Sequence, residues 1–328
     1  MTDFSRRSTL AGLLALAAAG GESREARAAG WPDRPITLIV PFPAGGGSDL
    51  FARPIAARMA AELGQTIVVD NRGGAGGTIG TAVAARAAPD GYTLLLGDTG
   101  LIYAPTIYPK PGFDFLRDFT PVGALARVPY VLAVNPARLD VATLAAFVAE
   151  ARKIPGAIDI GSAGLGTLTH LAIGLFEERT GVRLNHIPYR GGAPMLQDLL
   201  AGQVSAAFVL AGPLAPHVAD GKVRALAIAN RRREPILANV PTMQEAGVKE
   251  LRIAIWFGMF APATTPEPIL DRLHGAVQSA LRDPEIRRLW GEQGARVELE
   301  SRAEFATFVA REAERWNRIA RAANVRLE

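Results

Sequence analysis

The chain has 328 residues, of which 49% are hydrophobic and 21% charged, a composition typical of a globular protein rather than a disordered or fibrous one. The formal net charge is only +4, from 36 basic and 32 acidic residues without a long basic tract, so no nucleic-acid partner is expected. There is no cysteine, which excludes disulfides, thiol catalysis and thiolate metal sites.

The first expected element is a signal peptide over residues 1–28. Two adjacent arginines precede an apolar stretch at 10–20, which is too short for a permanent membrane anchor. Residues 26–28 (Ala-Arg-Ala) have the form of a cleavage site, so we expect cleavage after Ala28 and export to the periplasm. The paired arginines indicate the twin-arginine route, but Thr9 stands where that signal usually carries a hydrophobic residue, and the general route stays open.

From residue 30 onward, strand-like and helix-like segments alternate, which predicts parallel sheets covered by helices. Length and layout predict two α/β domains, with the C-terminal helices returning to the first. A proline-rich and aromatic stretch at 103–115 is expected to be a loop. Strands are expected at 36–40, 66–70, 92–96, 128–134, 157–161, 184–187, 204–210, 222–230 and 253–262. Helices are expected at 49–63, 78–88, 141–153, 167–179, 193–201, 266–281, 283–293 and 302–322.

A glycine-rich turn, PFPAGGGSD at 41–49, separates the first strand from the first helix. Ser48 or Asp49 is expected to cap this helix, and Pro54 is expected to kink it unless it lies near the helix start. A helix N-terminus presents unpaired N–H groups and the positive end of the helix dipole, which together favour an anion. Because the turn contains no lysine or arginine, its backbone must do the holding. Arg53 is expected to be a surface charge of the helix.

Phosphate is the first anion to consider, and the motifs speak against it. None of the glycine clusters at 45–47, 71–80 and 161–171 has the G-x-G-x-x-G spacing, and no G-x-x-x-x-G-K-[ST] motif occurs. The alternative reading of each cluster is a plain connection between a strand and a helix. Two of the turns, 41–49 and 161–169, follow strands in different expected domains. Facing each other, they could hold a small anion, and a carboxylate suits backbone N–H groups.

No catalytic constellation stands out, so neither enzyme activity nor a cofactor is expected. The G-x-S-x-G motif is absent. The four histidines are too far apart for a local metal motif, so no metal site is expected and each is interpreted as a surface or capping residue. They are His170, His186, His217 and His274.

Several motifs, in this order along the chain, resemble the Bug family of exported solute-binding proteins of tripartite tricarboxylate transporters. They are WPDRPITLIVPFPAGGGSDLFAR, VVDNRGGAGGTIGTAVAARAAPDGYTLLLGDTG, HIPYRGGAPMLQDLLAGQV, VRALAIAN, VPTMQEAG and WFGMFAPATTP. The resemblance covers the chain from about Trp31 to its end. It implies an α/β, two-lobed periplasmic-binding-protein fold of type II, whose hinged lobes close over a carboxylate in a cleft between them. It also implies a monomer that works with the membrane permease subunits of such a transporter.

The same resemblance carries over ligand-binding residues. The first pincer on the ligand carboxylate would be Phe42, Pro43, Ala44, Gly45 and Gly46, with Asp49 opening the helix. The second pincer would be Ser162, Ala163, Gly164, Gly166 and Thr167. Thr99 resembles a position whose hydroxyl faces the cleft, and Tyr189 and Arg190 match a Tyr-Lys-Gly turn with arginine for the commoner lysine. Ser205 replaces an aspartate that the family often has after GQV.

The expected division is 29–126 plus 229–328 for the first lobe and 127–228 for the second, with crossings near residues 125–128 and 227–230. The leading hypothesis is a receptor that delivers a small carboxylate to a permease. The alternatives are an α/β enzyme acting on a small carboxylate in the same cleft, or a solute-sensing subunit of a signalling system. Backbone amides bind all carboxylates alike, so the sequence leaves the ligand unnamed.

Overall fold

The computed structural model describes residues 30–323, and the expected signal peptide and its cleavage site lie outside them. Ten strands form one sheet in the order β2-β1-β3-β9-β4-β7-β5-β6, with β8 and β10 also paired to β4. The strands are β1 (Ile36–Val40), β2 (Ile67–Asn71), β3 (Thr93–Asp98), β4 (Phe119–Val134), β5 (Asp159–Ser162), β6 (Asn185–Pro188), β7 (Ala206–Leu210), β8 (Arg224–Ile228), β9 (Ala254–Pro262) and β10 (Arg296–Val297).

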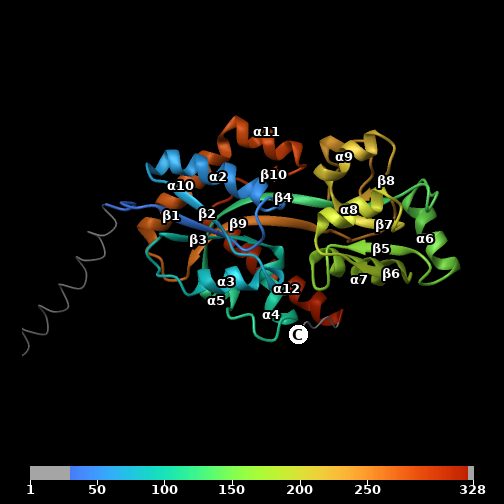
Figure 1. Cartoon of the computed structure of the whole chain (residues 1–328), viewed down its shortest axis with the longest axis horizontal. Coiled ribbons are helices and arrows are strands. Elements are labelled where there is room, and N and C mark those ends of the chain that lie inside the picture. The colour runs from blue at the N-terminus through green and yellow to red at the C-terminus, as the bar shows by residue number, and fades with distance from the viewer. Residues whose placement is uncertain (1–29, 324–328) are drawn as a thin grey trace, which may run out of the picture.

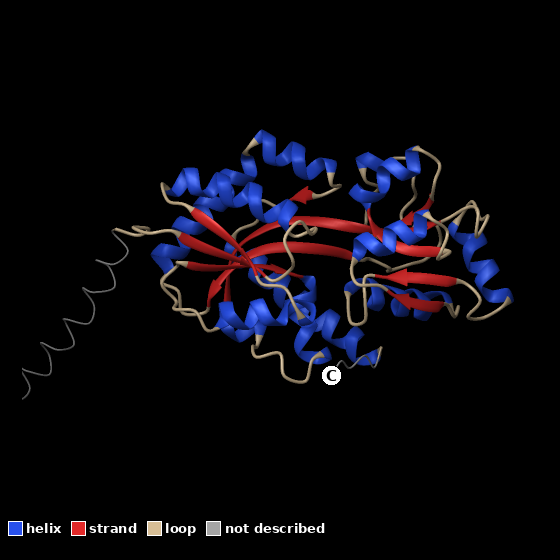
Figure 2. Ribbon diagram, in the orientation of Figure 1, coloured by secondary structure: helices blue, strands red, loops and turns tan. Residues whose placement is uncertain are grey.

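Helices cover both faces of the sheet in each half of the molecule (Figure 2). They are α2 (Asp49–Leu63), α3 (Thr78–Ala85), α4 (Thr99–Ile107), α5 (Phe115–Asp118), α6 (Leu144–Lys153), α7 (Leu168–Thr180), α8 (Gly192–Leu200), α9 (Ala211–Ala219), α10 (Glu267–Arg282), α11 (Pro284–Glu292) and α12 (Arg302–Ala322). Two short 3-10 helices are η1 (Ala75–Gly77) and η2 (Pro235–Leu237).

The long strand β4 joins two lobes, which lie to the left and right in Figure 1. Its residues from Phe119 to Pro129 pair with β9 in the first lobe. Its residues from Tyr130 to Val134 pair with β7 and β8 in the second lobe. The sequence predicted a strand only at 128–134, because Pro121 interrupts the apolar pattern before it.

Strand directions determine where the two glycine-rich turns point. β1 is parallel to β3, which is antiparallel to β9, which is antiparallel to β4, so β1 points the same way as β4. β7 is antiparallel to β4 and parallel to β5, so β5 points the opposite way. The carboxyl ends of β1 and β5 therefore both point toward the junction of the lobes. In open α/β sheets, this is the edge at which ligands bind.

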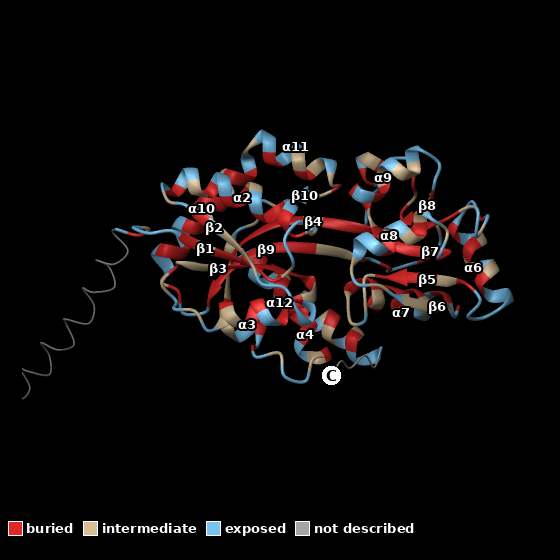
Figure 3. Ribbon diagram, viewed as in Figure 1, coloured by how far each residue is buried: buried red, intermediate tan, exposed pale blue. Residues whose placement is uncertain are grey.

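The central strands are buried along most of their length (Figure 3). One apolar cluster lies under α2, α10 and α11 in the first lobe, and another lies around α8 and α9 in the second. The largest cluster includes residues of α4, α7 and α12 and extends through both lobes. Because α12 packs on α4, β4 and α7, the C-terminal helix contacts both lobes.

Residues beyond the expected crossing at 227–230 still contact the second lobe. Leu237 and Val240 pack in the apolar cluster of the second lobe. Thr242 forms a β-bridge with Ile228. These contacts keep η2 and the residues after it against the second lobe, and they favour a return at the start of β9.

Two helices were not predicted because prolines interrupt their helical sequence pattern. The expected loop at 103–115 is partly helical, because α4 continues through Pro105 and buries apolar side chains against α12. The helix α9 was not predicted, since its sequence carries Pro213 near the start and Pro216 inside. By contrast, α2 has the predicted bounds, and Pro54 near its start leaves it one continuous helix.

Gly212 at the start of α9 makes a close contact between the lobes, which gives a first prediction. A Cβ atom there would lie 2.5 Å from the Cα and carbonyl oxygen of Gln293, just beyond α11. Backbone atoms cannot rotate away, so Gly212→Ala should lower the free energy of unfolding by about 1–3 kcal/mol in urea titrations. The matched control is Gly174→Ala inside α7, where a Cβ meets nothing within 4 Å. That variant should be neutral or slightly stabilised, and equal stability of both variants would contradict the contact.

Candidate ligand-binding site

The turn before α2 is organised around the buried carboxylate of Asp49. Its Oδ2 atom accepts the N–H of Gly45 at 2.7 Å and the guanidinium of Arg53 at 3.1 Å. Its Oδ1 atom accepts the amide of Asn71 at 2.8 Å. Asp49 therefore shapes the turn from inside, and its oxygens are already occupied. The expectation that Arg53 is only a surface charge is wrong, because it also donates to the Asn71 side chain.

The second glycine cluster, at 71–80, supports this turn from below. The Asn71 amide donates to the carbonyl oxygen of Phe42 at 3.1 Å. A Cβ on Gly73 would lie 2.9 Å from the ring of Pro43, and one on Gly80 would lie 2.5 Å from the carbonyl oxygen of Arg72. These glycines allow two loops to pack closely. The cluster therefore packs against the first turn and supports it. This role does not require the G-x-G-x-x-G spacing of a dinucleotide-binding turn.

The first turn leaves backbone donors free. Gly46 N–H donates to the carbonyl oxygen of Pro43, and Asp49 N–H donates to that of Gly46. Among residues 30–323, no protein acceptor faces the N–H of Gly47 or of Ser48. Ser48 occupies the N-cap position, but its side chain makes no capping hydrogen bond, contrary to expectation. Two backbone donors at the positive end of a 15-residue helix thus remain for an anion.

The second turn, between β5 and α7, is closed by its own side chains. Ala163 N–H donates to Thr169 Oγ1 at 2.8 Å, and Gly164 N–H donates to Ser162 Oγ at 3.2 Å. The Thr167 hydroxyl caps α7 and donates to the carbonyl oxygen of Gly164 at 2.7 Å. The turn is therefore a rigid cradle, and a ligand there would meet hydroxyl groups as well as backbone.

Two histidines lie beneath this cradle, and neither is the surface or capping residue that we expected. The rings of His170 and His186 stack with centroids 4.2 Å apart. Gly166 N–H donates to His170 Nδ1 at 3.1 Å, and Ser162 Oγ lies 2.6 Å from His186 Nε2. Because His170 Nδ1 accepts a hydrogen bond, it carries no proton. Burial lowers the pKa of His170, and burial together with His170 lowers the pKa of His186 to about 4.

This pair predicts a pH dependence of stability. The unfolded histidine binds a proton below about pH 6.5, whereas folded His186 does so only near pH 4, so the unfolded state binds more protons in this window. The free energy of unfolding should therefore fall as the pH is lowered from 7 to 4. Urea titrations of wild type and His186→Gln at pH 7, 6 and 5 check this. A variant that loses as much stability on acidification as wild type would contradict the assignment.

The remaining predicted residues lie near the same junction. Thr99 follows β3 and is fully buried, and its Oγ1 accepts the backbone N–H of Trp256 at 3.0 Å. In this structure its hydroxyl is therefore inside the protein rather than exposed. Tyr189 N–H donates to the carbonyl oxygen of Ser162, which ties the turn after β6 to the second turn. Arg190 beside it is exposed.

Sequence reasoning missed three residues that build the site. Asn71 and Thr169 position the turns, and Asp98 is a buried carboxyl group at the end of β3, where it caps α4. Burial raises the pKa of Asp98 to about 6. Asn71 was within a quoted motif, but nothing in the sequence placed it next to Asp49. Residues 30–323 hold no group of three or more side chains suited to a metal ion, and no helix among them is long and apolar enough to cross a membrane.

Comparison with known proteins decides the family. A family profile described as "Tripartite tricarboxylate transporter family receptor" matches residues 51–325. The chain belongs to this receptor family. BugT of Bordetella pertussis is 37% identical to it over 91% of this chain and 92% of its own length. The predicted resemblance to the Bug family is thereby confirmed.

Solved structures agree with the assignment of this chain to the receptor family. A protein of R. palustris solved with adipate has 37% identity and a TM-score of 0.82, covering 90% of this chain and 100% of its own. MatC from Rhodopseudomonas palustris, solved with bound malate, has 34% identity and a TM-score of 0.79, covering 88% and 100%. The predicted fold, two hinged lobes of the periplasmic-binding-protein type, is confirmed.

Proposed function

We propose that this receptor is exported, binds a small carboxylate between its lobes and delivers it to the membrane permease of a tripartite tricarboxylate transporter. The observation that carries the proposal is the first turn, where Gly47 and Ser48 present free backbone N–H groups at the start of α2. A carboxylate can accept both hydrogen bonds. Its charge would be stabilised by the helix dipole without any lysine or arginine in the turn.

Each lobe directs one glycine-rich turn toward the junction, which supports binding of the ligand between the lobes. The turn after β1 and the turn after β5 end strands that point toward the same junction. A ligand held by both turns would favour a closed hinge, and the permease would recognise the closed form. The relatives solved with adipate and with malate support a carboxylate as the ligand class. We propose that the protein acts as a monomer and without catalysis.

The hinge division also remains a proposal. We propose a first lobe of residues 29–126 joined by a C-terminal part, and a second lobe that begins at 127. Strand pairing supports the first crossing, since β4 changes partners at Pro129 and Tyr130. The packing of Leu237 and Val240 favours moving the return from 229 to Ala254, at the start of β9.

A thermal-shift screen over carboxylic acids, including adipate and malate, tests the proposed function. A true ligand stabilises the folded protein by RT ln(1 + [L]/Kd), which is about 2.7 kcal/mol at a hundredfold excess over Kd. We expect one or more acids to raise the midpoint and to be recovered chemically unchanged. Conversion of the acid would favour the enzyme alternative, and the absence of any stabilising carboxylate would contradict the proposal.

Export is open to a direct test of its own. We expect the mature protein to begin at Ala29, because residues 26–28 form an A-x-A cleavage pattern after an apolar stretch. N-terminal sequencing of protein from the periplasmic fraction checks this. A periplasmic protein that still began at Met1 would show that no signal peptide is removed.

A further inference from the structure

A cavity of ≈ 1040 Å³ lies where the two lobes meet, and none of the residues of the two turns lines it. We call it the hinge cavity. Its walls include Arg127 of β4, Asn230 and Arg231 after β8, and one face of α12. Arg179 and Glu250, from the second lobe, complete it. Its size is that of a small-molecule site, and its walls come from both lobes.

The hinge cavity is strongly cationic, with seven arginines and four glutamates in its lining. Some of these charges are already neutralised, since Arg127 pairs with Glu298 and Glu300. Arg315 pairs with Glu312 at 3.4 Å, and Arg179 pairs with Glu250 at 3.6 Å. In the described part of the chain, four other guanidinium groups of the lining have no carboxylate partner. They are Arg231, Arg252, Arg311 and Arg318.

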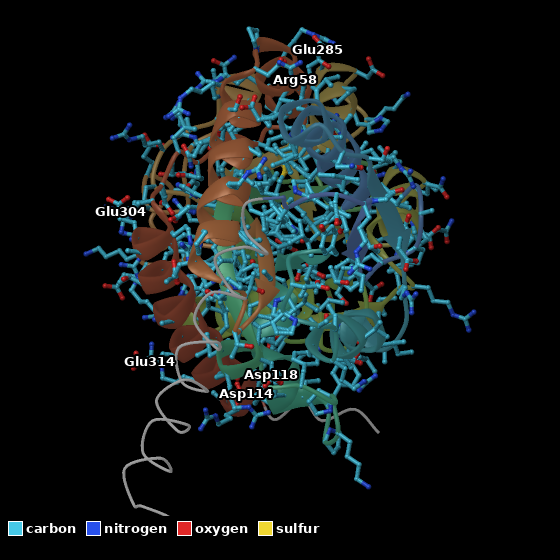
Figure 4. All side chains as sticks on the ribbon, turned by 90° about the vertical axis from the view of Figure 1, so that its left-hand side faces the viewer. Arg58, Asp114, Asp118, Glu285, Glu304 and Glu314 are labelled. Atoms are coloured by element: carbon cyan, nitrogen blue, oxygen red, sulfur yellow. The ribbon has the colours of Figure 1, made fainter. Side chains whose placement is uncertain are left out.

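The arginines of α12 are placed together by helix geometry. Arg311, Arg315 and Arg318 are spaced at i, i+4 and i+7, so they lie on one face of the helix. Like charges at this spacing repel one another, which an anion bound between them would relieve. Figure 4 shows α12 along one side of the molecule, with Glu304 near its start and Glu314 further along it. Of these two glutamates, only Glu304 lines the hinge cavity.

An unsatisfied donor lies in the same wall. Trp256 lines the hinge cavity, is only 2% exposed, and its indole N–H has no acceptor among residues 30–323. Buried donors without a partner are rare in folded proteins and call for an explanation, such as a ligand. Within the described part of the chain, the Oε2 atom of Glu300, another lining residue, has no donor either. Both atoms are covered by protein in this structure, so a ligand would first meet the exposed arginines of the lining.

We propose that the hinge cavity is a second binding site, for a small oxyanion that carries at least two phosphate or carboxylate groups. One anionic group would engage the free arginines of α12, and another would engage Arg252, beside Arg231, on the segment between β8 and β9. Because the walls come from both lobes, the affinity of this site would depend on the hinge angle. The site does not depend on the carboxylate proposed at the two turns, so either proposal can fail alone.

Calorimetric titration of the mature protein at low ionic strength tests the proposal, with pyrophosphate in one arm and tricarballylate in the other. If only one of these anions binds more weakly to the arginine variants described next, that anion shows whether the site takes phosphate or carboxylate groups. We expect Arg311→Gln combined with Arg318→Gln to weaken binding by at least about tenfold, because charge-assisted hydrogen bonds are lost. Arg252→Gln alone, on the segment before β9, should also weaken it. All three side chains are exposed and their loss should leave folding intact.

The matched control removes two charges elsewhere. Arg86→Gln combined with Lys110→Gln changes the net charge equally at exposed positions of the first lobe. This variant should bind as wild type does. If the control and the α12 variant lost the same affinity for the anion, the effect would come from net charge alone, and the proposed site would be contradicted. Failure of both anions to bind, or unchanged affinity in Arg252→Gln, would overturn it as well.

Discussion

Replacing Asp49 by alanine is expected to weaken carboxylate binding by at least about tenfold and to destabilise the protein by about 2–3 kcal/mol. The carboxylate is 5% exposed and accepts hydrogen bonds from Gly45, Arg53 and Asn71. Its removal leaves these donors without a partner and releases the backbone of the turn. Calorimetric titration with an acid identified by the screen, together with urea unfolding, measures both effects.

The pH dependence should identify the carboxylate as the cause. Burial alone raises the pKa of Asp49, but hydrogen bonds from Asn71 and Gly45 outweigh it and hold the pKa below its usual value. The ionised Asp49 carboxylate therefore stabilises the wild-type protein above about pH 4, and this stabilisation is lost as the pH falls further. The control is Asp271→Ala, which removes a 74% exposed carboxylate and should cost less than about 1 kcal/mol. Equal effects of the two variants would contradict the structural role of Asp49.

Replacing Gly46 by valine is expected to reduce carboxylate affinity by about ten- to a hundredfold with little loss of stability. A Cβ on Gly46 would lie 3.2 Å from the carbonyl oxygen of Pro43, which is tight, and the branched side chain would extend beside the free N–H groups. The turn is a partly exposed loop, so the core should remain unchanged.

The variant Gly46→Ala helps to distinguish a turn that binds the carboxylate from a turn that only connects a strand with a helix. It adds only the Cβ atom, and its affinity should lie between those of wild type and Gly46→Val. If Gly46 serves only to connect a strand with a helix, the variants should lose stability in urea while the folded molecules keep their affinity. That outcome would place the anion elsewhere.

Local signals in the sequence were enough to predict most of the elements. The bounds of α2 were predicted from the glycines before it and from its apolar face, and β1 was predicted from its β-branched run. Prediction was poorest where proline lies inside an element, as in α9 and in the long strand β4. There, burial and pairing outweigh the local cost of a missing N–H group, and neither is visible in a short stretch of sequence.

The site was predicted less fully, for a physical reason. Motifs indicated which turns matter, but the hydrogen bonds within them come from residues distant in the chain. Asn71 reaches Asp49 across 22 positions, and His186 reaches Ser162 across 24. The sequence also indicated backbone donors at both turns, whereas side chains occupy several of those at the second. Which N–H groups stay free depends on this tertiary arrangement.

The central claim is that the turn before α2 holds a carboxylate through its backbone, and a crystal structure of the receptor with an acid selected by the screen tests it most directly. We predict carboxylate oxygens within about 2.7–3.2 Å of the backbone nitrogens of Gly47 and Ser48. The second turn, with Thr167, should contact the same ligand from the other lobe. An acid bound away from residues 41–49, or held there by an arginine or lysine side chain instead of the backbone, would contradict the claim.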